Sequence, residues 1–348
     1  MKKKPILIYC LVTLLLIALF YLQFRAWRKF DWEIFLGQTR QVALWHVLAG
    51  VAYTYFAYVL RAVRWRIFLR PVKQTTTASL LAPTIIGFTG LSLLGRPGEM
   101  IRPYLIARKE GLSFSSQLAV WTIERIFDIG GFASLLVAAI LFASGPRQFG
   151  EYYPKFREGG FILVGLVILL AAGAALVRWK GETVASWVER QSGGLSSTIE
   201  HKLAARLREF SDGLNTIHGT SELVQLIAVS IGMWFLIALA YQQVTQSYGN
   251  PLLQVPVSQV FVLMASSMIG SMVQLPGVGG GSQLATIATL QHVFRIPPEL
   301  AASCGILLWL VTFMSVIPLG LALAHRERLS IRKLSKQSHE DEREAVRS

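Results

Sequence analysis

The chain has few charged residues and few cysteines. Charged residues make up 16% of the 348 residues and hydrophobic residues 53%, whereas a soluble domain averages about 25% charged and about 45–50% apolar residues. This composition excludes an ordinary soluble globular protein. Both cysteines, Cys10 and Cys304, lie inside apolar segments, so they indicate neither a disulfide framework nor a redox motif.

Residues typical of metal and nucleotide sites are also scarce. No two histidines lie at the spacing of a metal site; the six stand at positions 46, 201, 218, 292, 325 and 339. The glycine-rich segment 276–281 lacks the GK[ST] ending of a nucleotide-binding loop. We therefore expect no metal, no cofactor and no catalytic residue, and the sequence predicts a protein that is not an enzyme.

Acidic residues are outnumbered by basic residues, 20 to 34, which gives a formal net charge of +14. In a soluble protein this excess would suggest a nucleic-acid partner, but no recognised nucleic-acid-binding motif accompanies it. The basic residues stand mostly beside the ends of apolar runs, where the positive-inside rule and anionic lipid headgroups account for them. We expect membrane lipids, and no nucleic acid, as partners.

Long apolar runs are abundant. Six approach the ~20 residues that a helix needs to cross a ~30 Å hydrocarbon core, at residues 6–24, 43–60, 129–143, 161–177, 223–240 and 300–324. The first follows three lysines, as in a signal peptide, but it is long for one and no small-residue cleavage site follows it. We therefore favour an uncleaved first span. The sequence predicts an all-α, polytopic integral membrane protein with one membrane-embedded domain over residues 1–324.

The distribution of basic residues predicts the topology. Residues 61–73 contain five basic residues and no acidic one, so the end of the second span should be cytoplasmic. By the same rule we expect both termini in the cytoplasm and residues 144–160 outside. The membrane we expect is a bacterial inner membrane. Residues 179–220 should form a cytoplasmic amphipathic segment, and the tail at 325–348 should be cytoplasmic and disordered.

Two apolar segments are interrupted in the same way. Residues 77–94 end at Gly-Arg-Pro-Gly and residues 257–275 at Pro-Gly-Val-Gly-Gly-Gly, and each break precedes a short helical stretch and then a long apolar helix. The spans that precede the two breaks run in opposite directions, which is typical of inverted-repeat transporters with broken helices. We predict six full spans plus two broken or re-entrant hairpins in an inverted repeat; two full spans in place of each hairpin would leave the topology unchanged.

The first break carries charged residues that indicate an anion site. Arg96 precedes Pro97, which favours the first position of a new helix, and the free N–H groups of a helix start attract anions. Arg102 lies near the same helix start and can grip a phosphate with two parallel hydrogen bonds. The alternative is a turn at the membrane surface in which Arg96 and Glu99 form a local ion pair.

Charged residues also continue into the neighbouring helices. Glu124 and Asp128 share one helix face, and Arg125 can reach Asp128. Charge at bilayer depth costs roughly 2.5–3.5 kcal/mol per residue on insertion scales, so these groups should pair with the first-break arginines; an interfacial anchor or a proton relay are the alternatives. Arg61 and Arg64 at the end of the second span can extend the same phosphate site, or they mark topology alone.

The second break forms a further candidate binding loop. Its residues are Gly277, Gly279, Gly280, Ser282 and Gln283. Ser282 is expected to cap the following helix, which would direct a second helix start toward the ligand. A flexible hinge explains the same glycines.

The motifs together resemble a known family. RAVRW, GRPGEMIRPYLIARKEGLS, ER..D and the later PG-rich loop resemble the lysylphosphatidylglycerol synthase transmembrane family, which is flippase-like and UPF0104-like, over roughly residues 43–324. The resemblance implies a transporter-like domain of eight to ten helices that handles phospholipids or polyprenyl phosphates. Fused members also carry a soluble synthase domain, and the short tail here leads us to expect no aminoacyl transfer. Gln283 stands where the family usually has Glu, which puts an acid-dependent role there in doubt.

We therefore expect a protein that binds and translocates an anionic lipid, either a phospholipid or a polyprenyl-phosphate-linked lipid. The alternative is a non-transporting accessory or binding subunit for a lipid-modifying enzyme or a glycosyltransferase. A membrane transferase would need a nucleophile or an acid–base pair, and only Glu124 and Asp128 offer one.

Overall fold

The computed structural model describes residues 30–142, 153–155, 157–169, 172, 219–272, 274–275 and 279–327. The expected first span at 6–24, nearly all of the expected amphipathic segment at 179–220 and the tail beyond 327 lie outside the described residues. The described part is helical except for one short antiparallel pair, β1 (Gln274–Leu275) with β2 (Gly279–Gly280).

The helices follow the expected order along the chain. The first half contains α2 (Trp32–Arg40), α3 (Leu44–Leu69), α4 (Thr77–Leu94), the 3₁₀ helix η1 (Arg96–Met100), α5 (Ile101–Glu110) and α6 (Phe114–Phe142). The second contains α10 (Thr220–Gln246), η3 (Pro251–Leu253), α11 (Val257–Gly270), α12 (Gly281–His292), α13 (Pro298–Trp309), η4 (Leu310–Met314) and α14 (Val316–Arg326). Local sequence sets several of these starts: the Thr76 side chain, for example, caps α4 by accepting the N–H of Ser79.

Four helical segments among the described residues are long and apolar enough to cross a membrane. They are α3, α4, α10 and the continuous rod Pro298–Arg326, which joins α13, η4 and α14. The 18 residues of α4 reach about 27 Å at ~1.5 Å per residue, whereas the 10 residues of α5 reach only about 15 Å. The protein is thus a multi-pass, helical membrane protein; six full spans and re-entrant hairpins stay predictions.

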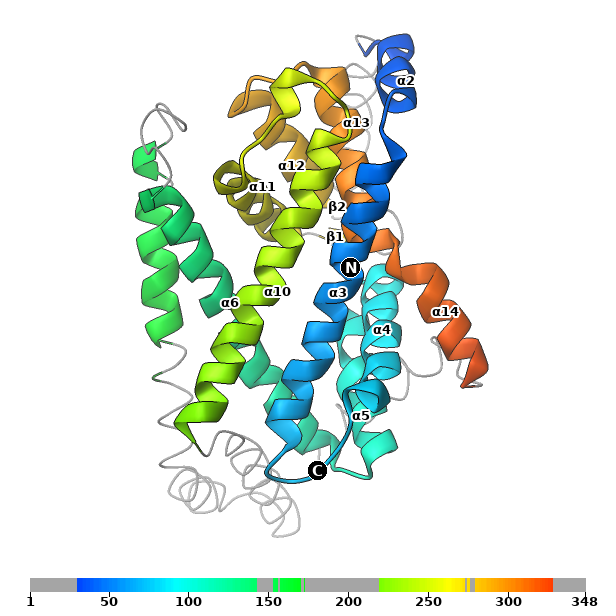
Figure 1. Ribbon diagram of the computed structural model, residues 1–348, viewed down its shortest axis with the longest axis vertical. Helices are drawn as coiled ribbons and strands as arrows, with labels where there is room; N and C mark the ends of the chain where they lie inside the picture. Colours follow the sequence, from blue (N-terminus) through cyan, green and yellow to red (C-terminus); the bar gives the residue numbers. More distant parts are fainter. Residues whose placement is uncertain are drawn as a thin grey trace, which may run out of the picture.

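The long helices α3 and α10 pack side by side and antiparallel along the molecule (Figure 1). At one end the Ala43 N–H donates to the Ser247 carbonyl at 2.7 Å. At the other end Arg70 Nη1 donates to Gln225 Oε1 at 2.8 Å. Because each long helix leads into one of the broken segments, the two helical hairpins α4–α5 and α11–α12 lie toward opposite ends of this pair (Figure 1).

Glycines allow each hairpin to close tightly. Gly95 turns the chain at the end of α4 with a φ of 71°, a conformation that favours glycine. A Cβ on Gly98 would clash with the backbone of Gly90, and a Cβ on Gly270 would clash with the backbone of Gly281. The two arms of each hairpin therefore touch backbone to backbone at corresponding places.

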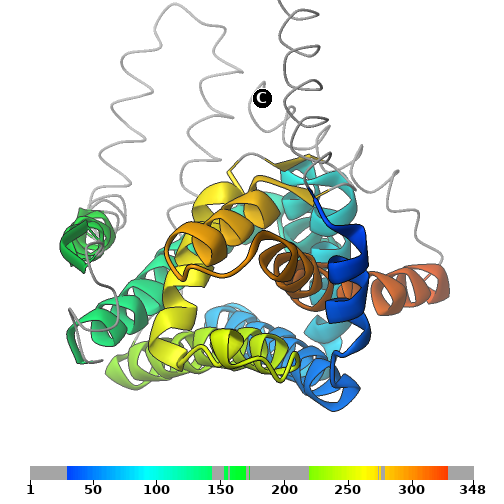
Figure 2. The same cartoon turned by 90° about the horizontal axis from the view of Figure 1, so that it is seen from above.

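Each hairpin packs into its own hydrophobic core. One core joins α3, α4, α5 and α6 around Trp65 and Phe68. The larger core joins α10, α11, α12 and α13 with the later part of α6. Seen from above, α3 and α10 lie along one side of the bundle, with both hairpins and α13 facing them (Figure 2).

The rod formed by α13, η4 and α14 contacts both hairpins. α13 packs against α12, and α14 packs against α4. Between them η4 is a π-helical turn, in which the N–H of Ser315 donates to the carbonyl of Leu310 at 2.9 Å. The wide turn places Phe313 so that its carbonyl accepts the hydroxyl of Ser92 from α4 at 2.9 Å.

Candidate functional site

The charged residues predicted from the sequence come together where α3, α5 and α6 meet. Residues three or four positions apart share a helix face, so Arg61 and Arg64 on α3 face Glu124 and Asp128 on α6. The side chains of Arg64 and Glu124 are fully buried. We call the six residues Arg61, Arg64, Arg102, Glu124, Arg125 and Asp128 the arginine–carboxylate cluster.

Glu124 is bound by three arginines of this cluster. Arg64 Nη2 donates to its Oε1 at 2.7 Å. Arg102 uses both terminal nitrogens, with Nη1 donating to Oε1 at 3.0 Å and Nη2 donating to Oε2. Arg125 Nη2 donates to Oε2 at 3.3 Å. The two-pronged contact from Arg102 fixes α5 to α6, because a guanidinium fork matches the geometry of a carboxylate.

Asp128 is also bound by three arginines. Arg64 Nη2 lies 2.7 Å from Oδ1, and Arg125 Nη2 lies 2.9 Å from Oδ2. Arg61 Nη1 lies 3.6 Å from Oδ2, the longest ion pair in the cluster. With four cations and two anions, the cluster holds two positive charges in excess. Buried charge needs partners, and the excess makes the cluster suited to an anion.

Aromatic rings support the arginines of the cluster. The guanidinium of Arg102 lies 4.5 Å from the centre of the Trp65 ring. Phe88 lies between two arginines, with its ring centre 4.7 Å from Arg61 and 5.2 Å from Arg102. Ring faces attract cations, and the attraction is stronger where water is excluded.

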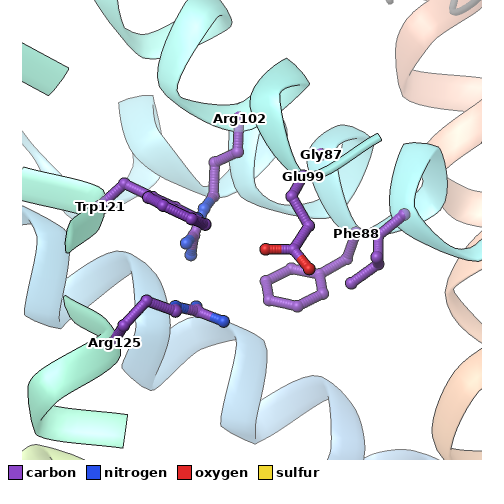
Figure 3. Close-up of a pocket in the computed structure, with 7 residues that line it drawn as sticks. Gly87, Phe88, Glu99, Arg102, Trp121 and Arg125 are labelled. Carbon is purple, nitrogen blue, oxygen red and sulfur yellow. The ribbon is translucent and has the colours of Figure 1, made fainter. Parts of the chain in front are cut away.

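A small pocket of about 20 Å³ lies against the first hairpin. Glu99, Arg102 and Arg125 point into it, as do the side chains of Phe88 and Trp121 (Figure 3). The short helix η1 begins at Arg96, so Pro97 is its second residue and not the first, as the sequence had suggested. Arg96, however, is exposed and is not among the lining residues of this pocket. The expected joint grip of Arg96 and Arg102 is therefore not formed, because η1 directs Arg96 outward.

A central cavity of about 160 Å³ lies between the two halves. Its lining includes Arg61 of the cluster and hydroxyl groups from both hairpins: Ser92 of α4, Ser271 directly after α11 and Ser282 of α12. Phe88 and Leu91 line both this cavity and the small pocket. Both hairpins therefore contribute polar groups to one space, beside the cluster.

The second hairpin is built somewhat differently from the prediction. Helix α12 begins at Gly281 with Gly280 as its cap, so Ser282 lies inside the first turn and is not the cap. Gln283 accepts the N–H of Gly280 at 3.0 Å through its Oε1. Gln283 lines a side chamber that shares Ser282 with the central cavity. Gly279 belongs to β2, and Gly277 lies outside the described residues.

A large apolar groove of about 550 Å³ lies beside the central cavity. It is enclosed by α6, the helical residues 157–169, α11 and α12. Met268 lines both the groove and the central cavity. Phe132 of the groove packs against Trp234 of the cavity, with ring centres 5.2 Å apart. A polar space and an apolar space thus share one wall.

The sequence did not identify the apolar residues that line the cavity and the groove. Phe88, Trp234 and Met268 belong to apolar helices, where hydrophobic periodicity cannot separate lipid-facing from cavity-facing positions. The only local signal is the serines near the Pro/Gly breaks, such as Ser92 and Ser271. Within the described residues, no three His, Cys, Asp or Glu side chains come together as metal ligands.

Comparison with known proteins identifies relatives of the whole membrane domain. The family model described as the lysylphosphatidylglycerol synthase TM region matches residues 6–320. Two proteins of Methanothermobacter thermautotrophicus, each named UPF0104 membrane protein, are similar to the chain. One is 23% identical over 82% of this chain and 86% of its own length. The other is 27% identical over 51% of this chain and 54% of its own length. No solved structure matches the chain.

Proposed function

Because the chain belongs to the lysylphosphatidylglycerol synthase transmembrane family, we propose that it binds an anionic lipid in its central cavity and moves that lipid between the two membrane leaflets. The protein lies in the cytoplasmic membrane with both termini in the cytoplasm, and it carries out no chemical step on the lipid.

The observation that carries this proposal is the shared wall between the central cavity and the apolar groove. An amphiphile needs a polar site for its headgroup and an adjacent apolar site for its chain. Met268 lines both spaces, so a lipid that displaced this side chain would have its headgroup beside Arg61 and its hydrocarbon chain in the groove. The groove, at about 550 Å³, has the volume of a typical ligand site of ~300–1,000 Å³.

The charge of the cluster supports an anionic headgroup. Its positive charges are divided between two sides: Arg61 lines the central cavity, whereas Arg102 and Arg125 line the small pocket, where the carboxylate of Glu99 offsets part of their charge. Arg61 makes the longest ion pair of the cluster, the 3.6 Å contact to Asp128. A phosphate beside Arg61 would give this guanidinium a second anionic partner. Hydrogen bonds to charged groups contribute about 1.5–3 kcal/mol, equivalent to a roughly 10- to 150-fold difference in affinity.

The arrangement of the hairpins supports translocation. Hairpins that follow antiparallel helices and contribute to one cavity are typical of alternating-access transporters, in which one half moves relative to the other. Here α4 and α11 both line the central cavity and approach it from opposite ends of the α3–α10 pair. Opening to one side or the other requires only that one hairpin moves at a time.

A reconstituted transport assay tests the proposal. The full-length protein is placed in phosphatidylglycerol-containing vesicles with a trace of fluorescent phosphatidylglycerol, and the fraction that becomes accessible to a membrane-impermeant quencher is followed. Wild type should move the lipid, and Arg61→Gln should slow it by about tenfold or more. Arg66→Gln is the matched control, because Arg66 lies on the same helix but is exposed.

Two results would contradict this function. Lipid retention without movement would favour the alternative of an accessory subunit that presents lipid to a lipid-modifying enzyme or a glycosyltransferase. Equal rates for wild type and Arg61→Gln would exclude the central cavity as the path.

A further inference from the structure

Among the described residues, the lining of the central cavity carries one positive charge, that of Arg61. Within the part of the chain that the structure describes, no Asp or Glu lines this cavity or the adjoining side chamber. Asp128, the nearest partner of Arg61, already binds Arg64 and Arg125 more closely. A ligand in the cavity therefore meets a single cation and no opposing carboxylate.

This charge pattern constrains the headgroup. One guanidinium matches the single charge of a phosphodiester, whereas a diphosphate would bring further negative charge without a partner. An ammonium group in the headgroup would be repelled by Arg61 at low local dielectric and would find no carboxylate to bind. The cavity therefore favours a headgroup whose remaining polar groups are uncharged.

Three hydroxyl groups of the lining are oriented as acceptors. Ser92 donates its hydrogen to the Phe313 carbonyl at 2.9 Å, Ser271 donates to the Met268 carbonyl at 2.6 Å, and Thr312 donates to the Leu308 carbonyl at 2.7 Å. A hydroxyl that has donated its hydrogen presents lone pairs. These lone pairs suit donors such as the hydroxyl groups of a glycerol or another polyol.

Two side chains add donors at the edges of this space. Trp234 lines the central cavity with its side chain largely buried, and its Nε1 has no hydrogen-bond partner among the described residues. Gln283 lines the side chamber, and because its Oε1 is occupied by the N–H of Gly280, its Nε2 is the group left to donate. A buried donor without a partner is costly, so a phosphate or hydroxyl oxygen that reached either N–H group would stabilise it.

We propose that the central cavity selects lipids with one phosphodiester and an uncharged, hydroxyl-bearing headgroup, and that it discriminates against headgroups that carry an amine. This inference rests on the proposed function and names the lipid class. Phosphatidylglycerol has this chemistry; phosphatidylethanolamine and lysylphosphatidylglycerol do not.

Lipid retention by the full-length protein tests the inference. The protein is reconstituted in phosphatidylcholine nanodiscs that contain equal amounts of phosphatidylglycerol and either phosphatidylethanolamine or lysylphosphatidylglycerol. The protein is then released from the nanodiscs, and the lipids that stay bound to it are counted by native mass spectrometry. Wild type should retain phosphatidylglycerol at least tenfold over either amine-bearing lipid. Arg61→Gln should lower the retention of phosphatidylglycerol specifically.

Gln283→Glu provides the converse test. The substitution keeps the oxygen that accepts the N–H of Gly280, so the start of α12 is preserved, and it adds a carboxylate to the side chamber. The ratio of phosphatidylglycerol to lysylphosphatidylglycerol should fall at least fivefold. Gln254→Glu, at an exposed loop position, is the matched control and should leave the ratio unchanged.

The outcomes separate this inference from the proposed function. Wild type that retains phosphatidylglycerol and lysylphosphatidylglycerol equally would overturn the selectivity but leave lipid binding intact. An unchanged ratio in a stable Gln283→Glu protein would likewise overturn it. Wild type that retains none of the three lipids would overturn the proposed function and the selectivity with it. The wild-type comparison decides the point even where Gln283→Glu does not fold.

Discussion

Replacing Glu124 by Gln should destabilise the protein strongly. The side chain is fully buried and joins Arg64 of α3, Arg102 of α5 and its neighbour Arg125. The cluster has four cations and two anions, so its formal charge rises from +2 to +3 when this carboxylate is neutralised. The glutamine keeps the volume of the side chain. Its NH₂ group, however, replaces one carboxylate oxygen and points its hydrogens at an arginine.

The size of the effect follows from which arginines lose their partner. Arg125 is 36% exposed at its side chain, so water can compensate it in part. Arg64 and Arg102 are 0% and 5% exposed and cannot be hydrated without opening the packing. Removing one member of a buried ion pair costs about 3–5 kcal/mol. We expect a loss in that range, which corresponds to a fall in the midpoint of thermal unfolding of several degrees or more.

The assay is the thermal unfolding of detergent-purified protein, combined with the yield of monodisperse protein. Glu33→Gln is the control, because Glu33 is exposed in the first turn of α2 and should cost about 0.5 kcal/mol or less. The double variant Glu124→Gln/Arg102→Gln returns the formal charge to +2 and should recover part of the loss, which a double-mutant cycle would measure. A Glu124→Gln protein as stable as wild type would refute the reasoning and would mean that water fills the cluster.

Three further predictions concern the same structure. Asp128→Asn should reduce both folding yield and lipid movement, because three arginines lose a partner. A normal yield with lost movement and an altered pH profile would instead indicate a proton relay, and no change in either would indicate an interfacial anchor. Gly98→Ala should destabilise the first hairpin by about 1–3 kcal/mol, because the added methyl group meets the backbone of Gly90; Gly165→Ala, with nothing within 4 Å, is the control in the same unfolding measurement. Single cysteines at positions 73 and 250 should react with a membrane-impermeant reagent from the cytoplasmic and the opposite side, respectively, since α3 and α10 are antiparallel; labelling from one side would contradict the topology.

Much of the charged site was predictable because charge in a membrane segment needs partners. The spacing put Arg61 with Arg64 on one face of their helix and Glu124 with Asp128 on one face of theirs. The expected pairing with Arg102 is confirmed for Glu124, whereas the direct pairing of Arg64 with both carboxylates was not predicted. Their role in lipid binding stays a prediction. The position of Arg96 was not predictable, because the sequence indicates a helix start at Pro97 but not the 3₁₀ turn that directs Arg96 outward.

The central cavity and the apolar groove were beyond sequence reasoning for a different reason. In a soluble helix, polar residues mark the face that points to water, but in a membrane helix apolar residues can face either lipid or a cavity, so they do not mark the cavity face. Phe88 and Met268 therefore look like ordinary hydrophobic residues. Ser282 illustrates a smaller error: a serine after glycines suggests a cap, but Gln283 supplies the capping contact and shifts the start of α12 by two residues from the predicted cap.

The π-helical turn η4 has a consequence for how the two hairpins are linked. A turn that inserts one extra residue rotates the remainder of the helix by about 100° relative to a continuous α-helix. This rotation lets one rod present one face of α13 to α12 and a different face of α14 to α4. If the extra residue moved along the helix by one turn, only the residues between its old and new positions would rotate, and the remainder of α14 would keep its face toward α4. The bulge therefore determines which helix faces are presented to the two hairpins, and the hydrogen bond from Ser92 to the Phe313 carbonyl joins the bulge itself to the first hairpin.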